Sequence, residues 1–135
     1  MNVFYLQIFE ADSVFFEGRV ERLSVPSVDG RYGVEAKHEN VVIPIVPGRI
    51  EFIPEKSKKE IGFVSEGMMR VEDNRVLVLV ESAERVDEID EQRALKEESD
   101  AKEMMLREQS LREYYLAEAM LRRAVERLKI KREWG

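Results

Sequence analysis

The sequence has no cysteine, a single histidine and no long apolar run, and each absence excludes a class of protein. Without cysteine the chain cannot be a disulfide scaffold, a zinc ribbon or a thiol-dependent enzyme. The single histidine, His38, excludes a two-histidine metal site within one chain. No stretch reaches the roughly 18 apolar residues that a membrane span needs, and the first residues lack the basic start of a signal peptide.

The net charge of −6 also argues against one class of partner. Domains that bind nucleic acid are usually basic, because much of their affinity comes from contacts with phosphates. We therefore expect no nucleic-acid partner.

Signals for catalysis are weak. Glu35, His38 and Glu39 are the nearest approach to a metal site, but a lone histidine in a loop is usually structural or exposed. No phosphate-binding loop of the P-loop type is present. The residues themselves therefore indicate no catalytic residue and no resident metal.

Helix breakers divide the chain near residue 85. All four prolines lie within the first 54 residues, and six of the seven glycines precede Met68. From Arg85 to Trp134 there is neither proline nor glycine. Such a shift in composition predicts two different architectures in one chain.

The first part has the pattern of short β-strands. Phe4, Leu6 and Ile8 alternate with Tyr5 and Gln7, as in a strand with one buried face. The pair Asp73-Asn74 should close a hairpin between residues 68–71 and residues 76–80. Because residues 76–80 are all apolar, we expect this strand to be buried on both faces or at the centre of a sandwich. The number of short strands suggests a sandwich or a barrel.

Apolar residues at helical spacing predict two helices in the second part. Asp87 should cap the first helix, and the turn between the helices should fall within residues 104–109. The second helix should run from about 110 to 132, with an apolar stripe that begins at Leu111.

The charge along these helices is polarised. Residues 87–103 carry a net charge of −5 and residues 119–135 a net charge of +4. An antiparallel hairpin would bring these opposite charges together, whereas an extended arm would offer its basic end to another acidic surface. The residues alone leave both arrangements open.

The order of several short motifs resembles a known family. The motifs are Phe16-Glu17-Gly18-Arg19-Val20, Leu23-Ser24-Val25-Pro26, Asp29-Gly30-Arg31-Tyr32-Gly33-Val34, Pro47-Gly48-Arg49-Ile50, Glu66-Gly67-Met68-Met69-Arg70-Val71, Asp73-Asn74-Arg75-Val76, Ala83-Glu84 and Ile89-Asp90-Glu91-Gln92-Arg93-Ala94. Followed by a two-helix tail, they are similar to the epsilon subunit of the bacterial rotary, F-type ATP synthase. Three places depart from the family's pattern: Lys37-His38-Glu39-Asn40 stands where glycine-histidine-alanine-proline is common, Arg31 where an acidic residue is common, and Asp100 where a basic one is common.

The resemblance implies a fold and a non-catalytic role in the central stalk. The fold would be an N-terminal antiparallel β-sandwich of about ten strands over residues 1–85, followed by a C-terminal two-helix antiparallel hairpin over residues 86–135. The sandwich would bind the gamma subunit and the c-ring, coupling proton flow to rotation at the cytoplasmic face of the bacterial plasma membrane, without a span of its own. The residues implied to face the c-ring are Asp29, Gly30, Arg31 and His38.

The resemblance also implies a regulatory hairpin. When extended, it would reach the alpha/beta catalytic head and block ATP hydrolysis through basic residues of its second helix, namely Arg122, Arg123, Arg127, Lys129, Lys131 and Arg132. When folded, it would rest on the sandwich and could bind ATP as a regulatory ligand, with no required cofactor. The implied ATP contacts are Glu84, Ile89, Asp90, Arg93, Ala94, Arg123 and Arg127.

Three alternatives stay open at this point. In the first, Asp90 and Arg93 only cap a helix, and the two later arginines form a solvated or head-binding face. In the second, the chain is an adaptor with a β-domain and a coiled-coil hairpin, unrelated to ATP synthesis. In the third, it is a hydrolase that uses a pair of carboxylates.

Overall fold

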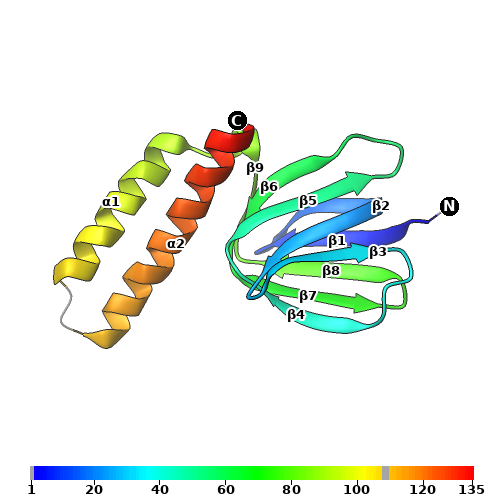
Figure 1. Ribbon diagram of the computed structural model, residues 1–135, viewed down its shortest axis with the longest axis horizontal. Coiled ribbons are helices and arrows are strands. Elements are labelled where there is room, and N and C mark those ends of the chain that lie inside the picture. The colour runs from blue at the N-terminus through cyan, green and yellow to red at the C-terminus, as the bar shows by residue number, and fades with distance from the viewer. Residues whose placement is uncertain (1, 108–109) are drawn as a thin grey trace.

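The computed structural model describes residues 2–107 and 110–135, which form a β-sandwich and a helical hairpin that projects from one end of it (Figure 1). The described residues form nine strands, against the expected ten or so. They are β1 (Phe4–Glu10), β2 (Ser13–Ser27), β3 (Gly30–Glu35), β4 (Val41–Ile45), β5 (Gly48–Pro54), β6 (Glu60–Val64), β7 (Gly67–Glu72), β8 (Arg75–Val80) and β9 (Ala83–Arg85). The predicted fold class, a sandwich followed by two packed helices, is confirmed.

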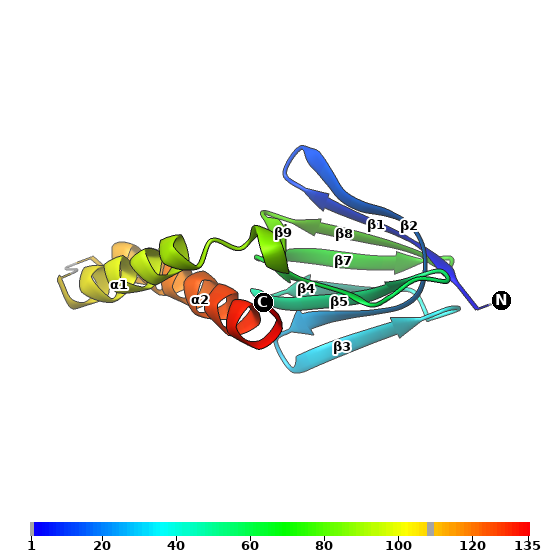
Figure 2. The same cartoon turned by 90° about the horizontal axis from the view of Figure 1, so that it is seen from above.

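The long strand β2 joins the two layers of the sandwich. All the strands belong to one hydrogen-bonded sheet in the order β4-β7-β8-β1-β2-β5-β6-β9, with β3 paired to β2. The first half of β2 pairs with β1 and its second half pairs with β3 and β5, and the register shifts between Val20 and Arg22. At this irregularity β2 bends from one layer into the other (Figure 2), because an extra residue in one strand strengthens its local twist and bend.

One strand pair differs from the expected antiparallel pattern. β1 and β8 run parallel, with Leu6 opposite Val76 and Ile8 opposite Val78. A parallel pair needs a long connection, and β2 to β7 supply it here. The alternation of apolar and polar residues within a strand does not indicate which strand it pairs with or in which direction.

The core lies between the layers and uses alternate residues of most strands. Leu6, Ile8, Leu23 and Phe52 are all fully or almost fully buried. Of the two alternatives for residues 76–80, burial on both faces is wrong, because Leu79 is 40% exposed. Val76, Val78 and Val80 are buried in the core of the sandwich. Only one face of β8 meets the opposite layer, and no other described part of the chain packs on its outer face.

The predicted turn between β7 and β8 is confirmed. Asp73 and Asn74 both have positive φ, 52° and 63°, as the two central residues of a type I′ hairpin turn do. The side chain of Asn74 has a second function, because it accepts a hydrogen bond from Lys37 N (2.7 Å) and donates one to Val3 O (3.0 Å). The turn thereby ties down both the β3–β4 loop and the N-terminal residues.

We expect Asn74→Ala to lower the free energy of unfolding by about 2–3 kcal/mol, because alanine is disfavoured at positive φ and two hydrogen bonds are lost. Asn74→Gly keeps the backbone conformation and should cost about half as much. Urea denaturation of both variants measures the difference. Equal losses in the two variants would show that the backbone conformation at Asn74 contributes nothing.

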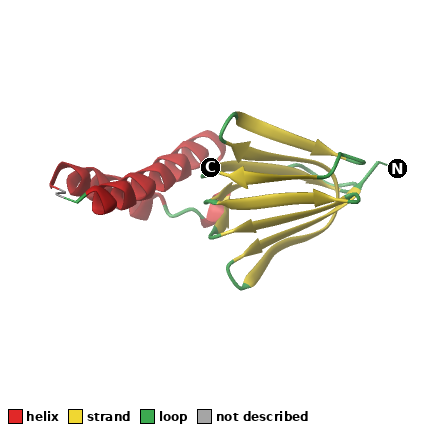
Figure 3. Ribbon diagram, turned by 90° about the horizontal axis from the view of Figure 1, so that it is seen from below, coloured by secondary structure: helices red, strands yellow, loops and turns green. Residues whose placement is uncertain are grey.

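The second part of the chain forms the predicted antiparallel hairpin. A short 3-10 helix, η1 (Val86–Glu88), precedes α1 (Glu91–Arg107), and α2 runs from Leu111 to Trp134. Figure 3 shows that the helices lie at one end of the strands and point away from them. The predicted turn within residues 104–109 lies partly outside the described residues, since α1 continues to Arg107 and residues 108 and 109 are not described.

The helix caps differ in part from the prediction. Asp90 caps α1 by accepting a hydrogen bond from Arg93 N at 3.1 Å, whereas Asp87 lies in the 3-10 helix that comes first. Ser110 caps α2 by accepting one from Glu113 N at 3.0 Å. The expected start of the apolar stripe at Leu111 is wrong, because Leu111 lies near the tip of the hairpin and is 69% exposed.

Small residues fill the contact between the two helices. Ala94 and Ala101 of α1, with Ala117 and Ala124 of α2, are fully or almost fully buried. Alanine side chains allow close approach of the helices but bury little apolar area. Because burial stabilises by about 25 cal/mol per Å² of apolar surface, each alanine contributes little. The helix–helix contact is therefore thin.

Candidate functional site at the hairpin–sandwich junction

The hairpin rests against one end of the sandwich through α2, which contacts β5, β6 and η1. An apolar cluster of Phe63, Ile89 and Ile130 lies at the centre of this contact, with Ile61 and Val86 packed against it. Phe63 comes from β6, Ile89 from the linker before α1, and Ile130 from α2. The cluster therefore joins the sandwich, the linker and the hairpin.

Arg127 is the most buried of the charged residues that line this contact from α2. Its guanidinium lies over the Phe63 ring, 4.4 Å from the centroid, and its Nη2 is 2.7 Å from Glu84 Oε2. Its side chain is only 16% exposed. A partly buried pair of this kind is screened less by salt than a surface pair.

Arg123, one turn before Arg127, forms a second ion pair with the sandwich. Its Nη1 lies 2.9 Å from Glu66 Oε2. The other carboxylate oxygen of Glu66 is buried and has no hydrogen-bond partner in the described part of the chain. Of the acidic partners of these arginines, Glu66 directly precedes β7 and Glu84 lies within β9.

A cavity of about 310 Å³ opens beside Arg127, between α1 and the sandwich. It brings together five of the seven predicted ATP contacts: Glu84, Asp90, Arg93, Ala94 and Arg127. The two others lie outside it, because Ile89 is buried in the apolar cluster and Arg123 is paired with Glu66. Ser82, Glu88 and Glu97 also line it, and the sequence carried no signal for them.

The two arginines of this cavity are engaged by carboxylates. Arg127 pairs with Glu84, and Arg93 Nε lies 3.1 Å from Glu97 Oε1, one turn along α1. The Arg93 pair is exposed, so it is weak and readily exchanged. A phosphate that enters this cavity must therefore displace a carboxylate.

Asp100, the acidic departure from the family's pattern, lies further along α1. It pairs with Lys96 at 2.9 Å and its hydrogen bond raises the pKa of that lysine. Its charge is thus matched locally by Lys96 rather than directed at the cavity.

The predicted inhibitory residues divide into two groups. Arg123, Arg127 and Lys131 face the sandwich or its linker, and Lys131 Nζ donates a hydrogen bond to Val86 O at 3.1 Å. Arg122, Lys129 and Arg132 are exposed. The exposed group is available to a partner while the hairpin is docked.

The four residues predicted to face the c-ring do not lie together. Asp29 and Gly30 form the turn between β2 and β3, whereas His38 lies in the loop at the far end of β3 (Figure 1). Arg31 is folded onto the sheet, where its Nε donates to Ser24 Oγ at 3.0 Å. The His38 ring contacts Tyr32 Oη and Glu39 O. Among the described residues, no group of three or more acidic, histidine or cysteine side chains is placed to hold a metal ion.

Comparison with known proteins decides the family. The family model described as "ATP synthase, Delta/Epsilon chain, beta-sandwich domain" matches residues 3–86. The chain belongs to this family. It is similar to the "ATP synthase epsilon chain" of Herpetosiphon aurantiacus, with 36% identity over 93% of this chain and 91% of the relative. It is also similar to the "ATP synthase epsilon chain" of Caldicellulosiruptor saccharolyticus, with 32% identity over 98% of this chain and 96% of the relative.

Two solved structures share the fold of this family member. The mitochondrial ATP synthase of Euglena gracilis (OSCP/F1/c-ring, rotational state 1) contains a chain with a TM-score of 0.78 and 24% identity, covering 90% of this chain and 76% of that one. The central stalk/c-ring structure of Tetrahymena thermophila mitochondrial ATP synthase contains one with a TM-score of 0.69 and 14% identity, covering 94% and 95%.

Family membership makes the chain a non-catalytic subunit of ATP synthase. It thereby excludes the adaptor unrelated to ATP synthesis and the hydrolase. None of the helices in the described ranges is both long enough and apolar enough to cross a membrane.

We expect Arg127→Ala to weaken docking of the hairpin by about 1.5–3 kcal/mol, because Glu84 would stay partly buried without its partner. Arg122→Ala, on the exposed face of the same helix, should change stability by less than about 0.5 kcal/mol. Denaturation followed by the fluorescence of Trp134, the single tryptophan, measures both, since Trp134 lies on Arg49 at the docked end of α2. Equal stability of the two variants would show that the Arg127 pair does not hold the hairpin.

Proposed function

We propose that this chain is a rotor subunit of the central stalk, peripheral to the membrane at the cytoplasmic face of the bacterial plasma membrane. Its sandwich binds the gamma subunit and the c-ring, and its hairpin inhibits ATP hydrolysis when it leaves the sandwich. The near full-length match to relatives named as epsilon chains supports this role. The observation that carries the regulatory part is the docking of α2 by exchangeable ion pairs around a small apolar cluster.

An exposed apolar row supports binding of the sandwich to the gamma subunit. The row crosses five neighbouring strands from β4 to β2, and each of its residues lies opposite the next one on the adjacent strand. Its residues are Pro44, Met68, Leu79, Phe9 and Val14. Val14, Met68 and Leu79 of this row are exposed large apolar side chains. Contiguous exposed apolar surface of this kind marks a protein–protein contact.

For the c-ring we propose the turn at Asp29 and Gly30 as the contact. These residues are exposed, and Val28 beside them is 72% exposed. His38 is a weaker candidate, since it lies at the other end of β3 and its ring is engaged by Tyr32 and Glu39. Arg31 is held on the sheet by Ser24, and we do not include it in the c-ring contact.

Inhibition follows from competition for the same arginines. While docked, Arg123 and Arg127 are paired with Glu66 and Glu84. When α2 leaves the sandwich, both join Arg122, Lys129, Lys131 and Arg132 as a basic surface suited to acidic residues of the alpha/beta head. One guanidinium cannot hold both partners, so docking and inhibition exclude each other.

For regulation we propose that ATP enters the cavity beside Arg127 and stabilises the docked state. Its phosphates would take Arg93 from the exposed Glu97 pair and bridge α1 to Arg127 on α2. A ligand present at 100 times its dissociation constant would add about 2.7 kcal/mol to docking. The convergence of five predicted contacts on one cavity supports this proposal.

The ATP proposal predicts saturable binding in a calorimetric titration of the full chain. Arg93→Ala should weaken that binding at least about tenfold, since one charge-assisted contact is worth about 1.5–3 kcal/mol. Lys96→Ala is the matched control, because both side chains lie on α1, are 77% exposed and form a pair one turn away. Absence of binding at millimolar ATP, or equal loss in both variants, would remove ATP sensing and leave the stalk assignment standing.

The inhibition proposal is tested in the assembled ATP synthase. The triple substitution Arg122→Ala, Lys129→Ala and Arg132→Ala removes basic side chains that are exposed in the docked state. It should therefore leave docking unchanged. Because it weakens the contact with the acidic head, it should raise several-fold the rate of ATP hydrolysis that the inhibited enzyme shows. The control is a chain that ends at residue 85, which should be fully uninhibited. Unchanged inhibition in the triple variant would contradict an electrostatic contact.

A further inference from the structure

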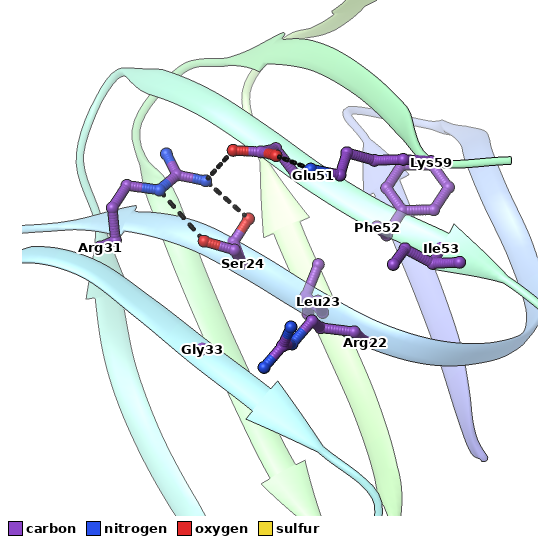
Figure 4. A pocket seen from close by; sticks show the side chains of 9 residues that line it. All are labelled: Arg22, Leu23, Ser24, Arg31, Gly33, Glu51, Phe52, Ile53 and Lys59. Carbon is purple, nitrogen blue, oxygen red and sulfur yellow. Dashed lines mark hydrogen bonds and ion pairs between the residues drawn. The ribbon is translucent and has the colours of Figure 1, made fainter. Parts of the chain in front are cut away.

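A second cavity lies on the outer face of β2, β3 and β5, apart from the hairpin cavity. It measures about 410 Å³, within the range of roughly 300–1,000 Å³ typical of small-molecule sites. Figure 4 shows Arg22, Arg31 and Lys59 around it, with Glu51 at its rim. A Cβ atom added to Gly33, which lines this cavity, would meet nothing within 4 Å, so the space above it is open.

Three basic side chains converge on one carboxylate at this cavity. Glu51 Oε2 lies 2.8 Å from Arg49 Nε and 3.5 Å from Arg31 Nη2, and Glu51 Oε1 lies 3.2 Å from Lys59 Nζ. Burial disfavours the charged form of Glu51, but hydrogen bonds from Lys59 and Arg49 outweigh it and lower the pKa of this carboxyl. One cation would be enough to keep Glu51 ionised. The cluster therefore holds two positive charges more than its carboxylate neutralises.

Arg31 is held in place by hydrogen bonds, but its charge is partly buried and lies near the charge of Arg49, an unfavourable arrangement that a bound anion would relieve. Its guanidinium donates to Ser24 Oγ at 3.0 Å, to Ser24 O at 3.2 Å and to Arg49 O. Burial and the nearby charge of Arg49 lower the pKa of Arg31, while Glu51 opposes that shift. An additional negative charge would stabilise these neighbouring cations together.

A fourth cation, Arg22, lies at the other side of the cavity. Arg22 pairs with Glu35 at 3.0 Å, and both side chains are exposed. Such a pair is weak and readily exchanged for another anion. Guanidinium groups match the oxygens of phosphate in geometry, and the lysine adds a point charge.

We propose that this cavity, the outer-face anion site, binds a phosphate group. Arg22, Arg31 and Lys59 contact the phosphate oxygens, and the Ser24 hydroxyl, which accepts from Arg31, donates its own hydrogen. The site shares no residue with the cavity beside Arg127. It is therefore a different site from the one proposed for ATP.

The test is a titration of the isotope-labelled full chain with inorganic phosphate at constant ionic strength, followed by NMR of the backbone amides. We expect saturable shifts at Ser24, Gly33 and Lys59. Lys59→Ala should weaken binding about five- to tenfold, the effect of removing one charge roughly 5 Å from the anion in a largely solvated site. Lys58→Ala is the matched control, because this exposed neighbour is not among the described residues that line the cavity.

Glu51→Gln provides a test of opposite sign. Removing the single carboxylate that the three cations share should tighten phosphate binding several-fold, whereas a site that merely needs Glu51 for its structure would bind less. Circular dichroism of the variant shows whether the sandwich is still folded. Weaker binding by a folded Glu51→Gln chain would overturn the proposal.

The source of the phosphate group is decided by a second arm, in which vesicles of phosphatidylglycerol are compared with vesicles of phosphatidylcholine. Sedimentation with the first alone, lost in Lys59→Ala, would identify a lipid headgroup. Shifts with inorganic phosphate alone would identify a soluble ligand. No saturable response in either arm, or shifts confined to Arg93 and Arg127, would overturn the proposal, and the latter result would support the hairpin cavity instead.

Discussion

The place of the hairpin depends on one aromatic side chain, Phe63, which points away from the core of the sandwich. It is nevertheless fully buried, because Ile89 and Ile130 cover it. Burial of such a side chain is worth about 1.5–3 kcal/mol, and exposure would forfeit it. Arg127 adds a cation over the same ring. The apolar contact thus sets where α2 lies, and the ion pairs of Arg123 and Arg127 set how it is turned about its axis.

The interface that results is small, and ion pairs surround its apolar centre. Its ion pairs join arginines of one element to carboxylates of another, so each arginine has an alternative partner in a phosphate or in an acidic protein surface. Between α1 and α2 the alanine contact is thin. Both features agree with the movement of the hairpin that we propose.

Charge in this protein is organised locally rather than by its total. The chain is acidic overall, with a net charge of −6, yet three cations share Glu51 on the outer face. Exposed charges beyond about 8–10 Å are screened at physiological ionic strength. This cluster therefore sets the charge at the outer-face cavity more than the distant acidic residues do, and the net charge of the chain does not describe this surface.

The sequence by itself determined most of the strands, the turn at Asp73 and Asn74, the two helices and the family. These features depend on local spacing and on residue types with strong conformational preferences. Only the tertiary structure decided the parallel pairing of β1 with β8, the partial exposure of Leu79, and the partners of the arginines on α2. Arg127 and Glu84 are 43 residues apart, and no local pattern links them. Their contact exists because the burial of Phe63 brings α2 onto the sandwich.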